Sequence, residues 1–556
     1  MAHPALASAI PAWPPSLSQP ELDHLASLAL DYALSHGLIY RPPYPDPSVH
    51  NPLSASAISA PVSLFPSPFP RDLYTRVINL QSAYNELYAR ITMDDRWLDH
   101  VVRGCFWGDN GGDSFMRDVW QGWKDSQEEG VKQPLQLLLS RSDYLLHQSL
   151  SKKNEPLSMK QVEFNTISSS FGSLSEKVGG LHRYLTLQTG YLNASPCLQI
   201  KNLPANSPIH GLANGLAEAH KAFNIPESSI LFVVQDGERN AFDQRWLEYE
   251  LLETHGIRSH RASLATLQRA SSTNSSYQLI YCNPSSPQNT PELISVVYYR
   301  AAYTPDDYAS PTDWTTRTRI ERTTAIKCPS YALQLAGSKK VQQVLTMPGV
   351  LEYFLPSSGD LVDSDKEVTP SARKQGAKTY DSIELNALRD SFMGLWPLGD
   401  DTTLSEEGER LIKESGGGIG YVLKPQREGG GNNVYNADIG PFLEKLAEQD
   451  KKLPASSPPS KSAYILMSLI TPPPTLSNLL LRSVPPQTDK PTADYSLALK
   501  ETISELGVYG ATLFGKETGT VHNDGNVGTL LRTKGRESDE GGVAVGYSVL
   551  DSVVLI

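Results

Sequence analysis

The sequence predicts a mixed α/β protein: an α+β body into which a small, doubly wound α/β domain is inserted. Apolar residues recur at helical spacing from Arg71 to Leu150, which predicts helices through this region. Between residues 230 and 300, short apolar runs alternate with helical patterns, as is typical of a small sheet covered by helices. The expected division is 1–226 for the first part of the body, 227–325 for the inserted domain and 326–556 for the rest of the body.

Bulk composition narrows the classes of partner. The chain has 556 residues, and its formal net charge is −12. This balance disfavours nucleic acid or an anionic membrane as the main partner, so we expect neither. Four separated cysteines without a CxxC pair indicate a reducing compartment, and no Lys or Arg precedes Arg41, unlike the start of a signal peptide. We therefore expect a cytoplasmic protein.

A polar stripe follows the helical region. Residues 159–172 begin as a strand in which Gln161, Glu163 and Asn165 alternate with apolar residues, so these three should share one face. Glu163 and Asn165 would then share a metal ion or face solvent from an edge strand, and the segment alone leaves both open. The serines at 168–170 would donate hydrogen bonds to a ligand or form a turn.

Polar residues also follow the strands of the inserted domain. Glu238, Asn240 and Gln244 come after its first buried strand, and Arg300 and Tyr303 come after its last. Ligands of such sheets bind beyond the carboxyl ends of the strands. We therefore expect these side chains to lie near a ligand.

The strongest signal is the stretch from Gly420 to Tyr435, which reads as the end of a buried strand followed by three consecutive glycines. Glycine lets a ligand approach the backbone closely, and successive exposed N–H groups form an anion-binding concavity. Charged and amide side chains surround these glycines: Lys424, Arg427, Glu428, Asn432 and Asn433. Groups that donate hydrogen bonds to phosphate, placed next to a carboxylate, favour a site for a magnesium nucleotide over a plain hairpin turn.

Three later segments complete the pattern. Strand 464–470 would read an adenine edge with its backbone or simply belong to the core. Residues 530–544 carry charges around a Gly pair, as expected of a ligand-covering lid or of a charged surface loop. Residues 510–517 nearly match the phosphate-loop pattern GxxxxGK[ST], but Glu517 replaces its hydroxyl, so we expect a strand at 508–514 and a hairpin turn at 515–519.

Six blocks of the sequence resemble eukaryotic glutathione synthetases: VEFNTISSSFG, DGERNAFDQRWLEYELL, ERTTAIKCPS with QLAGSKKVQQ, VLKPQREGGGNN, ISELGVYG, and LLRTK followed by GGVA. The resemblance implies an ATP-grasp fold, a homodimer, and a substrate-binding role for the inserted domain. It implies ligation of γ-glutamylcysteine to glycine with ATP and Mg²⁺ through an acyl phosphate, beneath a Gly-rich loop at 424–433 and a lid at 532–544. The alternatives are a ligase with another amine acceptor, such as β-alanine, and a catalytically silent binding protein.

The resemblance also implies roles for individual residues. The implied metal ligands are Glu163, Asn165 and Glu428. The implied nucleotide contacts are Glu163, Lys327, Lys424, Pro425, Gln426, Arg427, Glu428, Gly429, Gly430, Gly431, Asn432, Asn433, Tyr435, Met467, Ser468, Leu469, Ile470, Glu505, Lys534 and Glu540. The implied substrate contacts are Arg141, Ile167, Ser168, Ser169, Ser170, Glu238, Arg239, Asn240, Gln244, Arg300, Ala301, Ala302, Tyr303, Arg532, Val543 and Ala544. The residues implied to act on the transferred phosphoryl group are Arg532, Lys424 and Lys327.

Overall fold

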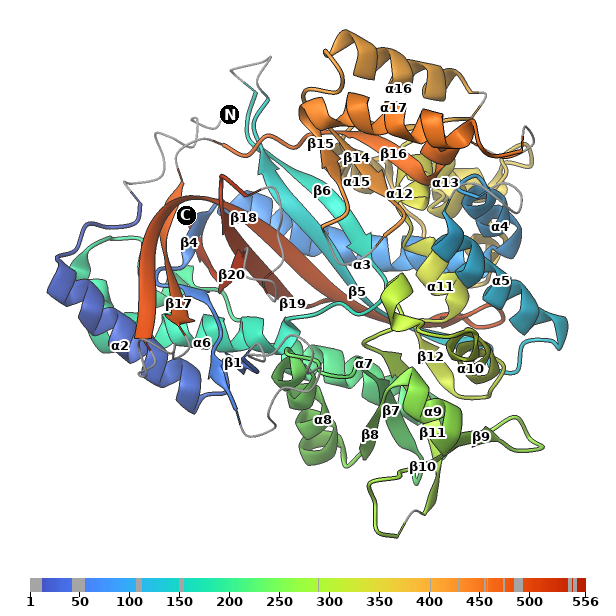
Figure 1. Cartoon of the computed structure of the whole chain (residues 1–556), viewed down its shortest axis with the longest axis horizontal. Helices are drawn as coiled ribbons and strands as arrows, with labels where there is room; N and C mark the ends of the chain where they lie inside the picture. The colour runs from blue at the N-terminus through green and yellow to red at the C-terminus, as the bar shows by residue number, and fades with distance from the viewer. Residues whose placement is uncertain are drawn as a thin grey trace.

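A large mixed sheet runs through the middle of the molecule (Figure 1). The computed structural model describes residues 13–42, 56–106, 113–149, 155–288, 290–400, 402–427, 431–454, 457, 459–473, 476–484, 494–538, 543 and 548–556. Within these residues the sheet has thirteen strands, and its main path is β17-β3-β20-β19-β18-β5-β12-β11-β10-β9. Strand β6 pairs with β5, and β7 joins β11 to β8. The strand bounds are β3 (Val62–Ser63), β5 (Leu135–His147), β6 (Ser158–Asn165), β7 (Ser229–Val233), β8 (Ser259–Ala262), β9 (Ser271–Thr273), β10 (Leu279–Cys282), β11 (Pro291–Tyr299), β12 (Ile326–Cys328), β17 (Ser477–Val484), β18 (Asp494–Gly515), β19 (Gly519–Gly535) and β20 (Ser548–Asp551).

Helices cover both faces of this sheet. Side chains from α3 (Arg71–Met93), α4 (Asp95–Arg103) and α5 (Ser114–Glu128) form one apolar core with one face of β5. Side chains from α2 (Gln19–Ser35), α6 (Gly172–Thr189) and α7 (Pro208–Phe223) form a second core with its other face. Alternating leucines of β5 enter the two cores, with Leu138 in the first and Leu137 and Leu139 in the second. The sheet is therefore a buried middle layer.

The helical prediction for residues 71–150 is wrong at its end, because residues 135–147 form the central strand β5. Both faces of β5 are buried, so its apolar residues form a run in place of the alternation that marks a half-buried strand. Such a run cannot be distinguished from a buried helix by spacing alone. Near the N-terminus, helix α2 ends at Ser35, and Gly37 follows it with φ +72°.

The predicted hairpin after residue 508 is also confirmed. Strands β18 and β19 pair along their length in antiparallel fashion, and they turn at residues 516–518. Both strands are longer than expected. Because β19 continues to Gly535, Arg532 and Lys534 lie on a strand, so the expected lid does not begin at residue 532. Residues 539–542 and 544 of that expected lid lie outside the described residues.

The strands of the inserted segment continue the main sheet. Strand β7 is parallel to both β8 and β11, and α8 (Ala241–His255) and α9 (Leu264–Ala270) pack beside them. The predicted alternation of strands and helices between residues 230 and 300 is thus confirmed. Strand β12 is parallel to β11 on one side and to β5 on the other, which joins this segment to the body. The carboxyl ends of β7 and β11 therefore face the same region as the polar end of β5.

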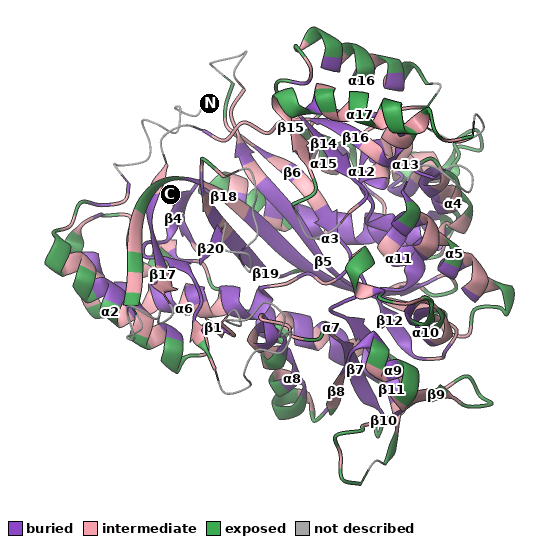
Figure 2. Cartoon of the chain, viewed as in Figure 1, coloured by how far each residue is buried: buried purple, intermediate pink, exposed green. Residues whose placement is uncertain are grey.

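A second sheet carries the strand that precedes the Gly-rich stretch. Its order is β13-β16-β14-β15, and α16 (Thr403–Glu414) and α17 (Ile439–Asp450) cover one face. Figure 2 shows the outer sides of these two helices exposed, whereas the central strands of the main sheet are mostly buried. The strand bounds are β13 (Leu395–Pro397), β14 (Tyr421–Pro425), β15 (Val434–Tyr435) and β16 (Tyr464–Ser468).

The remaining elements connect these layers. The helices are α10 (Pro311–Glu321), α11 (Tyr331–Ala336), α12 (Lys339–Leu345), α13 (Val350–Phe354), α14 (Ser358–Val362) and α15 (Ser382–Ser391). The short strands are β1 (Ile39–Tyr40), β2 (Ile58–Ser59), β4 (Ser67–Phe69) and β21 (Val553–Leu555). In the described part of the chain, no helix combines the length and apolar character that crossing a bilayer requires.

Candidate active site

A cavity of about 570 Å³ lies where the main sheet, the small sheet and the inserted segment meet. Its walls come from segments that are far apart in the sequence, including β5, β6, β14, β16, β18 and β19. The sequence-predicted residues that line it are Arg141, Glu163, Asn165, Ile167, Ser168, Ser169, Ser170, Glu238, Asn240, Tyr303, Lys424, Asn433, Tyr435, Met467, Ser468, Leu469, Ile470, Glu505, Arg532, Lys534 and Val543.

A β-bulge shapes the wall that β6 contributes. Asp143 of β5 pairs with Glu163, but the next residue of β5 pairs with Gln161, so Val162 is the extra residue. A bulge re-aims the side chains beyond it. Glu163 and Asn165 line the cavity as the alternation predicted, whereas Gln161 is fully buried and contacts Gln342. Placing Gln161 on the same face as Glu163 was therefore wrong, because strict alternation ignores the bulge.

Two lysines surround the Glu163 carboxylate. Lys339 Nζ lies 3.0 Å from Glu163 Oε2, and Lys424 Nζ donates to the Val162 carbonyl at 2.7 Å. Burial opposes ionisation of Glu163, but the positive charges of Lys339 and Lys424 overcome it and hold the pKa of this carboxyl well below its usual range. The carboxylate therefore stays ionised at neutral pH. Ammonium groups such as these form charge-assisted hydrogen bonds with phosphate oxygens.

The same wall suits a hard cation. Asn165 uses its amide N–H groups on the Arg141 carbonyl at 3.2 Å and on Asp143 Oδ2 at 3.0 Å, which leaves its side-chain oxygen as a ligand. Carboxylate and amide oxygens are what Mg²⁺ prefers, and it commonly takes few protein ligands together with substrate phosphates. Glu163 and Asn165 therefore fit a magnesium site. Within the described residues, no cluster of three or more His, Cys, Asp or Glu side chains could hold a metal by itself.

An arginine cluster occupies the adjoining floor. Arg141 Nε and Nη2 donate to the two carboxylate oxygens of Asp143 at 2.6 and 2.7 Å. Arg532 Nη2 donates to Asp143 Oδ2 at 3.2 Å and also forms an ion pair with Glu505. A Cβ at Gly507 would lie 2.7 Å from Arg141 Cδ and 2.9 Å from Asp143 Oδ1. Only glycine therefore leaves room for this buried pair at that position.

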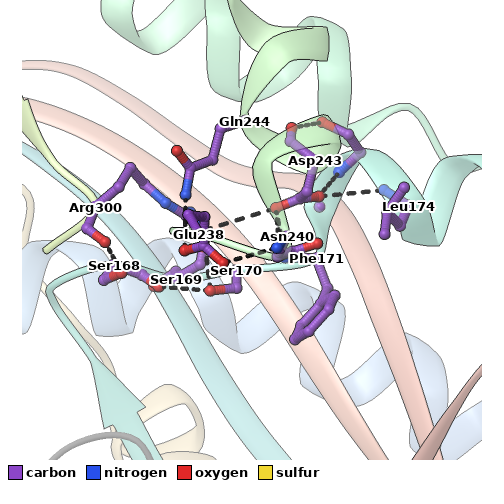
Figure 3. Close-up of polar contacts among 12 residues, drawn as sticks. Ser168, Ser169, Ser170, Phe171, Leu174, Glu238, Asn240, Asp243, Gln244 and Arg300 are labelled. Carbon is purple, nitrogen blue, oxygen red and sulfur yellow. Dashed lines mark hydrogen bonds and ion pairs between the residues drawn. The ribbon is translucent and has the colours of Figure 1, made fainter. Parts of the chain in front are cut away.

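The serines at 168–170 form a turn that Arg300 holds (Figure 3). Arg300 Nη1 donates to the Ser169 carbonyl at 2.8 Å, and Nη2 donates to Ser170 Oγ at 2.9 Å. Ser168 Oγ in turn donates to the Arg300 carbonyl at 3.2 Å. Ser168 has φ +52°, a region that side chains other than glycine rarely adopt, and such strain persists only where the surroundings fix the backbone. Arg300 is buried beneath the turn, while the serines themselves line the cavity.

Asp243 ties this turn to the inserted segment (Figure 3). Its carboxylate accepts hydrogen bonds from the backbone N–H groups of Phe171 at 2.9 Å, Ser173 at 2.9 Å and Leu174 at 3.2 Å. It also lies 3.7 Å from Arg300 Nη2. A carboxylate at the start of α6 satisfies N–H groups that the helix cannot pair internally. Asp243 therefore fixes the start of α6 and the turn before it.

Of the remaining predicted substrate contacts, some line the cavity and others lie behind its wall. Glu238 lines the cavity and accepts from Gln244 Nε2 at 3.2 Å, and Gln244 is held from behind by Arg261 at 2.7 Å. Arg239 Nε donates to the Arg41 carbonyl at 3.3 Å, which takes it away from the cavity. Tyr303 lines the cavity. Ala301 and Ala302 are buried beneath it.

The Gly-rich stretch after Lys424 likewise contains residues that line the cavity and residues that support its wall. Gln426 accepts from the Lys340 backbone N–H at 3.0 Å, and Arg427 forms an ion pair with Asp113 at 3.1 Å. Both anchor the end of β14 against neighbouring elements. Pro425, at the end of β14, is opposite Tyr464 of β16. Gly431 and Asn432 are described, whereas the predicted residues outside the described part of the chain are Glu428, Gly429, Gly430, Glu540 and Ala544.

Lys327 is not among the residues that line the cavity beside Glu163. Its Nζ donates to the carbonyls of Thr323 at 2.7 Å and Ala325 at 2.9 Å, and it lines a different cavity of about 260 Å³. Lys327 is opposite Gln136 at the start of β5, five residues and roughly 16 Å along the sheet from Arg141. Burial lowers the pKa of Lys327 to about 8.

Sequence reasoning missed three residues that shape the site: Lys339, Asp143 and Asp243. Lys339 carried a readable signal, because it follows the Ser338 N-cap and is the first residue of α12. A cation there opposes the helix dipole, so its presence needs another reason. Asp143 lies two residues from Arg141 on β5, so the strand period puts the two side chains on one face, but this signal required β5 to be recognised as a strand. Asp243 carried none, since the backbone N–H groups that it binds lie on a distant segment.

The fold is of the ATP-grasp type, and its main cavity is lined by Glu163, which two lysines flank, and by two arginines. The family model of the eukaryotic glutathione synthase ATP-binding domain matches residues 19–555. The chain belongs to the eukaryotic glutathione synthase family, whose members are ATP-dependent ligases.

Relatives match along nearly the whole chain. The glutathione synthetase large chain of Schizosaccharomyces pombe is 35% identical, covering 96% of this chain and 98% of its own. The glutathione synthetase of Bos taurus is 33% identical, covering 96% of each chain. Among solved structures, a glutathione synthetase-like effector from Globodera pallida superposes with a TM-score of 0.67 at 21% identity, covering 97% of this chain and 98% of that one. That similarity supports the fold.

Proposed function

We propose that this protein joins γ-glutamylcysteine to glycine, with cleavage of ATP to ADP and phosphate, and so makes glutathione. One observation carries the proposal. A single cavity combines a carboxylate flanked by Lys339 and Lys424 with a floor that holds Arg141 and Arg532. The first group suits a magnesium nucleotide, and the second suits the carboxylate that must be activated.

In the proposed reaction, an oxygen of the cysteinyl carboxylate attacks the γ-phosphorus of ATP. The bond between that phosphorus and the bridging oxygen breaks, ADP leaves, and an acyl phosphate forms. The amine of glycine then attacks the acyl carbon, phosphate leaves with the bonding electrons, and the amine loses a proton. Positioning and neutralisation of charge supply most of the rate enhancement of such a transfer.

The chain's own groups divide this work. Lys339 and Lys424 balance the charge of the nucleotide phosphates, and Arg141 and Arg532 orient the carboxylate or the transferred phosphoryl group. Magnesium held by Glu163 and Asn165, with Glu428 as a third ligand, supplies further neutralisation of phosphate charge when bound. The turn at residues 168–170 and the inserted segment at 227–325 bind the dipeptide.

The adenine site is expected at the end of β16. Met467 pairs with Val422 on one side and with Leu395 on the other, so its backbone is already used within the sheet. Leu469 and Ile470 follow the strand and line the cavity, and they provide an apolar surface for a base. The Leu469 N–H donates to the Gly420 carbonyl at 2.9 Å, so the Leu469 carbonyl and the Ile470 backbone are our candidates for recognition of the adenine edge.

Three wider features belong to the same proposal. The protein acts as a homodimer, as the resemblance of its sequence blocks implies. It acts in the cytoplasm, since its four cysteines form no disulfide. Its partners are small molecules, and its net charge of −12 disfavours nucleic acid.

Phosphate release with γ-glutamylcysteine and ATP, compared across glycine, β-alanine and no acceptor, tests the function. Rapid, glycine-dependent release together with glutathione in the products is the expected result. Only a methylene separates the two acceptors, which corresponds to about 1–3 kcal/mol of discrimination. Faster release with β-alanine would reassign the acceptor, and no acceptor-dependent release at all would exclude the ligase. A Glu163→Gln variant serves as the inactive control.

A further inference from the structure

We infer that Asp143 is a positioning residue that aims the two site arginines, an inference that rests on the proposed function and adds a residue to its machinery. Asp143 is fully buried, behind Arg141 and Arg532. Both arginines line the cavity. The carboxylate therefore contacts the groups that would hold the substrate, while it is itself shielded from solvent.

The first support is the geometry of the contacts. Arg141 makes a two-point contact with Asp143, at 2.6 and 2.7 Å, and a bidentate pair fixes the plane of the guanidinium as well as its position. The remaining Nη1 donates to the Ser170 carbonyl at 3.2 Å, which links Arg141 to the serine turn. Arg532 donates from Nη2 to the same Asp143 Oδ2 that Arg141 uses.

The second support is electrostatic. Arg141 and Arg532 are like charges brought together on one floor, and the Arg141 charge disfavours the charged form of Arg532. Asp143 lies between them, and Glu505 pairs with Arg532 on the far side. Without the Asp143 charge, the two guanidiniums would repel each other in a partly desolvated site. We therefore expect at least one of them to rotate toward solvent or toward Glu505.

The third support is that the sheet makes room for this arrangement. Gly507 is opposite Asp143 in β18, and a Cβ there would collide with both Arg141 and Asp143. On the other side, Asn165 of β6 donates to Asp143 Oδ2 at 3.0 Å, so the same carboxylate also orients one proposed magnesium ligand. One buried carboxylate thus sets the direction of two arginines and an amide.

The test uses Asp143→Asn in the full-length protein. An amide removes the charge and turns an N–H donor toward a guanidinium, while the volume stays almost the same. With γ-glutamylcysteine as the varied substrate, kcat/KM should fall by about 100-fold. The Kd for ATP, measured by calorimetry, should change by less than about threefold, because Asp143 touches neither of the site lysines.

Glu86→Gln is the matched control, since Glu86 also pairs with a buried arginine, Arg90, at 2.6 Å, but in helix α3. It should lower thermal stability without changing kcat/KM of the folded enzyme. Equal kinetic constants for Asp143→Asn and wild type would overturn the inference. A loss of ATP affinity as large as the loss in kcat/KM would also overturn it, because that pattern indicates general disruption.

Crystal structures of wild type and Asp143→Asn without substrates separate this inference from the proposed function. The inference requires the Arg141 or the Arg532 guanidinium to have turned away from its wild-type direction. Unchanged arginines would refute it even if wild type is an active ligase. If wild type makes no glutathione, the proposed function fails, while reoriented arginines would still establish the positioning role.

Discussion

Replacing the charged side chain of Lys339 with an apolar one should strongly weaken productive binding of ATP. Lys339 Nζ lies 3.0 Å from Glu163, and only 3% of the residue is exposed. With an effective dielectric constant of about 20, the attraction between two unit charges at that distance is roughly 5 kcal/mol, and the cost of desolvating the two groups offsets part of it. Losing a charge-assisted contact costs about 1.5–3 kcal/mol in practice, which is roughly a 10- to 150-fold change in an equilibrium constant.

We therefore expect Lys339→Met to lower kcat/KM for ATP by about 100-fold in a phosphate-release assay at saturating γ-glutamylcysteine and glycine. Lys327→Met is the matched comparison, because Lys327 is equally buried but bonds the Thr323 and Ala325 carbonyls and lines a different cavity from Glu163. It should change kcat/KM for ATP by less than about threefold. If instead Lys327→Met abolished ATP use and Lys339→Met did not, the reasoning from the cavity would be refuted, and the nucleotide role implied for Lys327 would stand.

Four further predictions follow from the same geometry. Arg300→Ala should raise KM for γ-glutamylcysteine about 10- to 150-fold and KM for ATP far less, because Arg300 holds the serine turn. Equal effects on the two KM values would make the role of Arg300 purely structural. The free energy of unfolding of wild type, relative to that of Lys327→Met, should rise by about 3 kcal/mol between pH 8 and 10.5. The reason is that the Lys327 pKa of about 8 in the folded protein lies below the unfolded value, so the unfolded chain binds one more proton in this range. Denaturant melts in which wild type and Lys327→Met show the same pH dependence would contradict this. Gly507→Ala should destabilise the fold by about 1–3 kcal/mol and reduce turnover, whereas Gly179→Ala, with open space at its Cβ, should be neutral or stabilising in the same melts. Glu428→Gln should reduce kcat more than it raises KM for ATP, and wild-type turnover at ordinary Mg²⁺ would remove Glu428 from the ligand set.

Local pattern was enough to predict several parts of the site. The alternation around Glu163 placed Glu163 and Asn165 on one face of a strand, and the order of residues after Leu423 placed Lys424 at a strand exit beside the Gly-rich stretch. Both side chains line the cavity. These predictions succeeded because they depend on a residue and its near neighbours along the chain.

Strand β5 shows where local pattern fails. Residues 135–147 are buried on both faces, so they lack the alternation that distinguishes a strand from a buried helix. The bulge at Val162 is a second case, because it depends on how β5 and β6 pair and not on either strand alone. Register between strands is a tertiary property, and a one-residue slip moves every side chain to the opposite face.

The sequence by itself determined the class of the molecule: its blocks around Glu163, Lys424 and Arg532 carried the resemblance to a family of ligases. Only the tertiary structure decided which lysine stands beside Glu163, because Lys327 and Lys339 are both buried lysines close together in the chain, at opposite ends of one loop-and-helix segment. The same holds for Asp143, whose partners beyond Arg141 lie on β6 and β19. Charge interactions act through space over a few ångströms, and the sheet, not the order of residues, sets those distances.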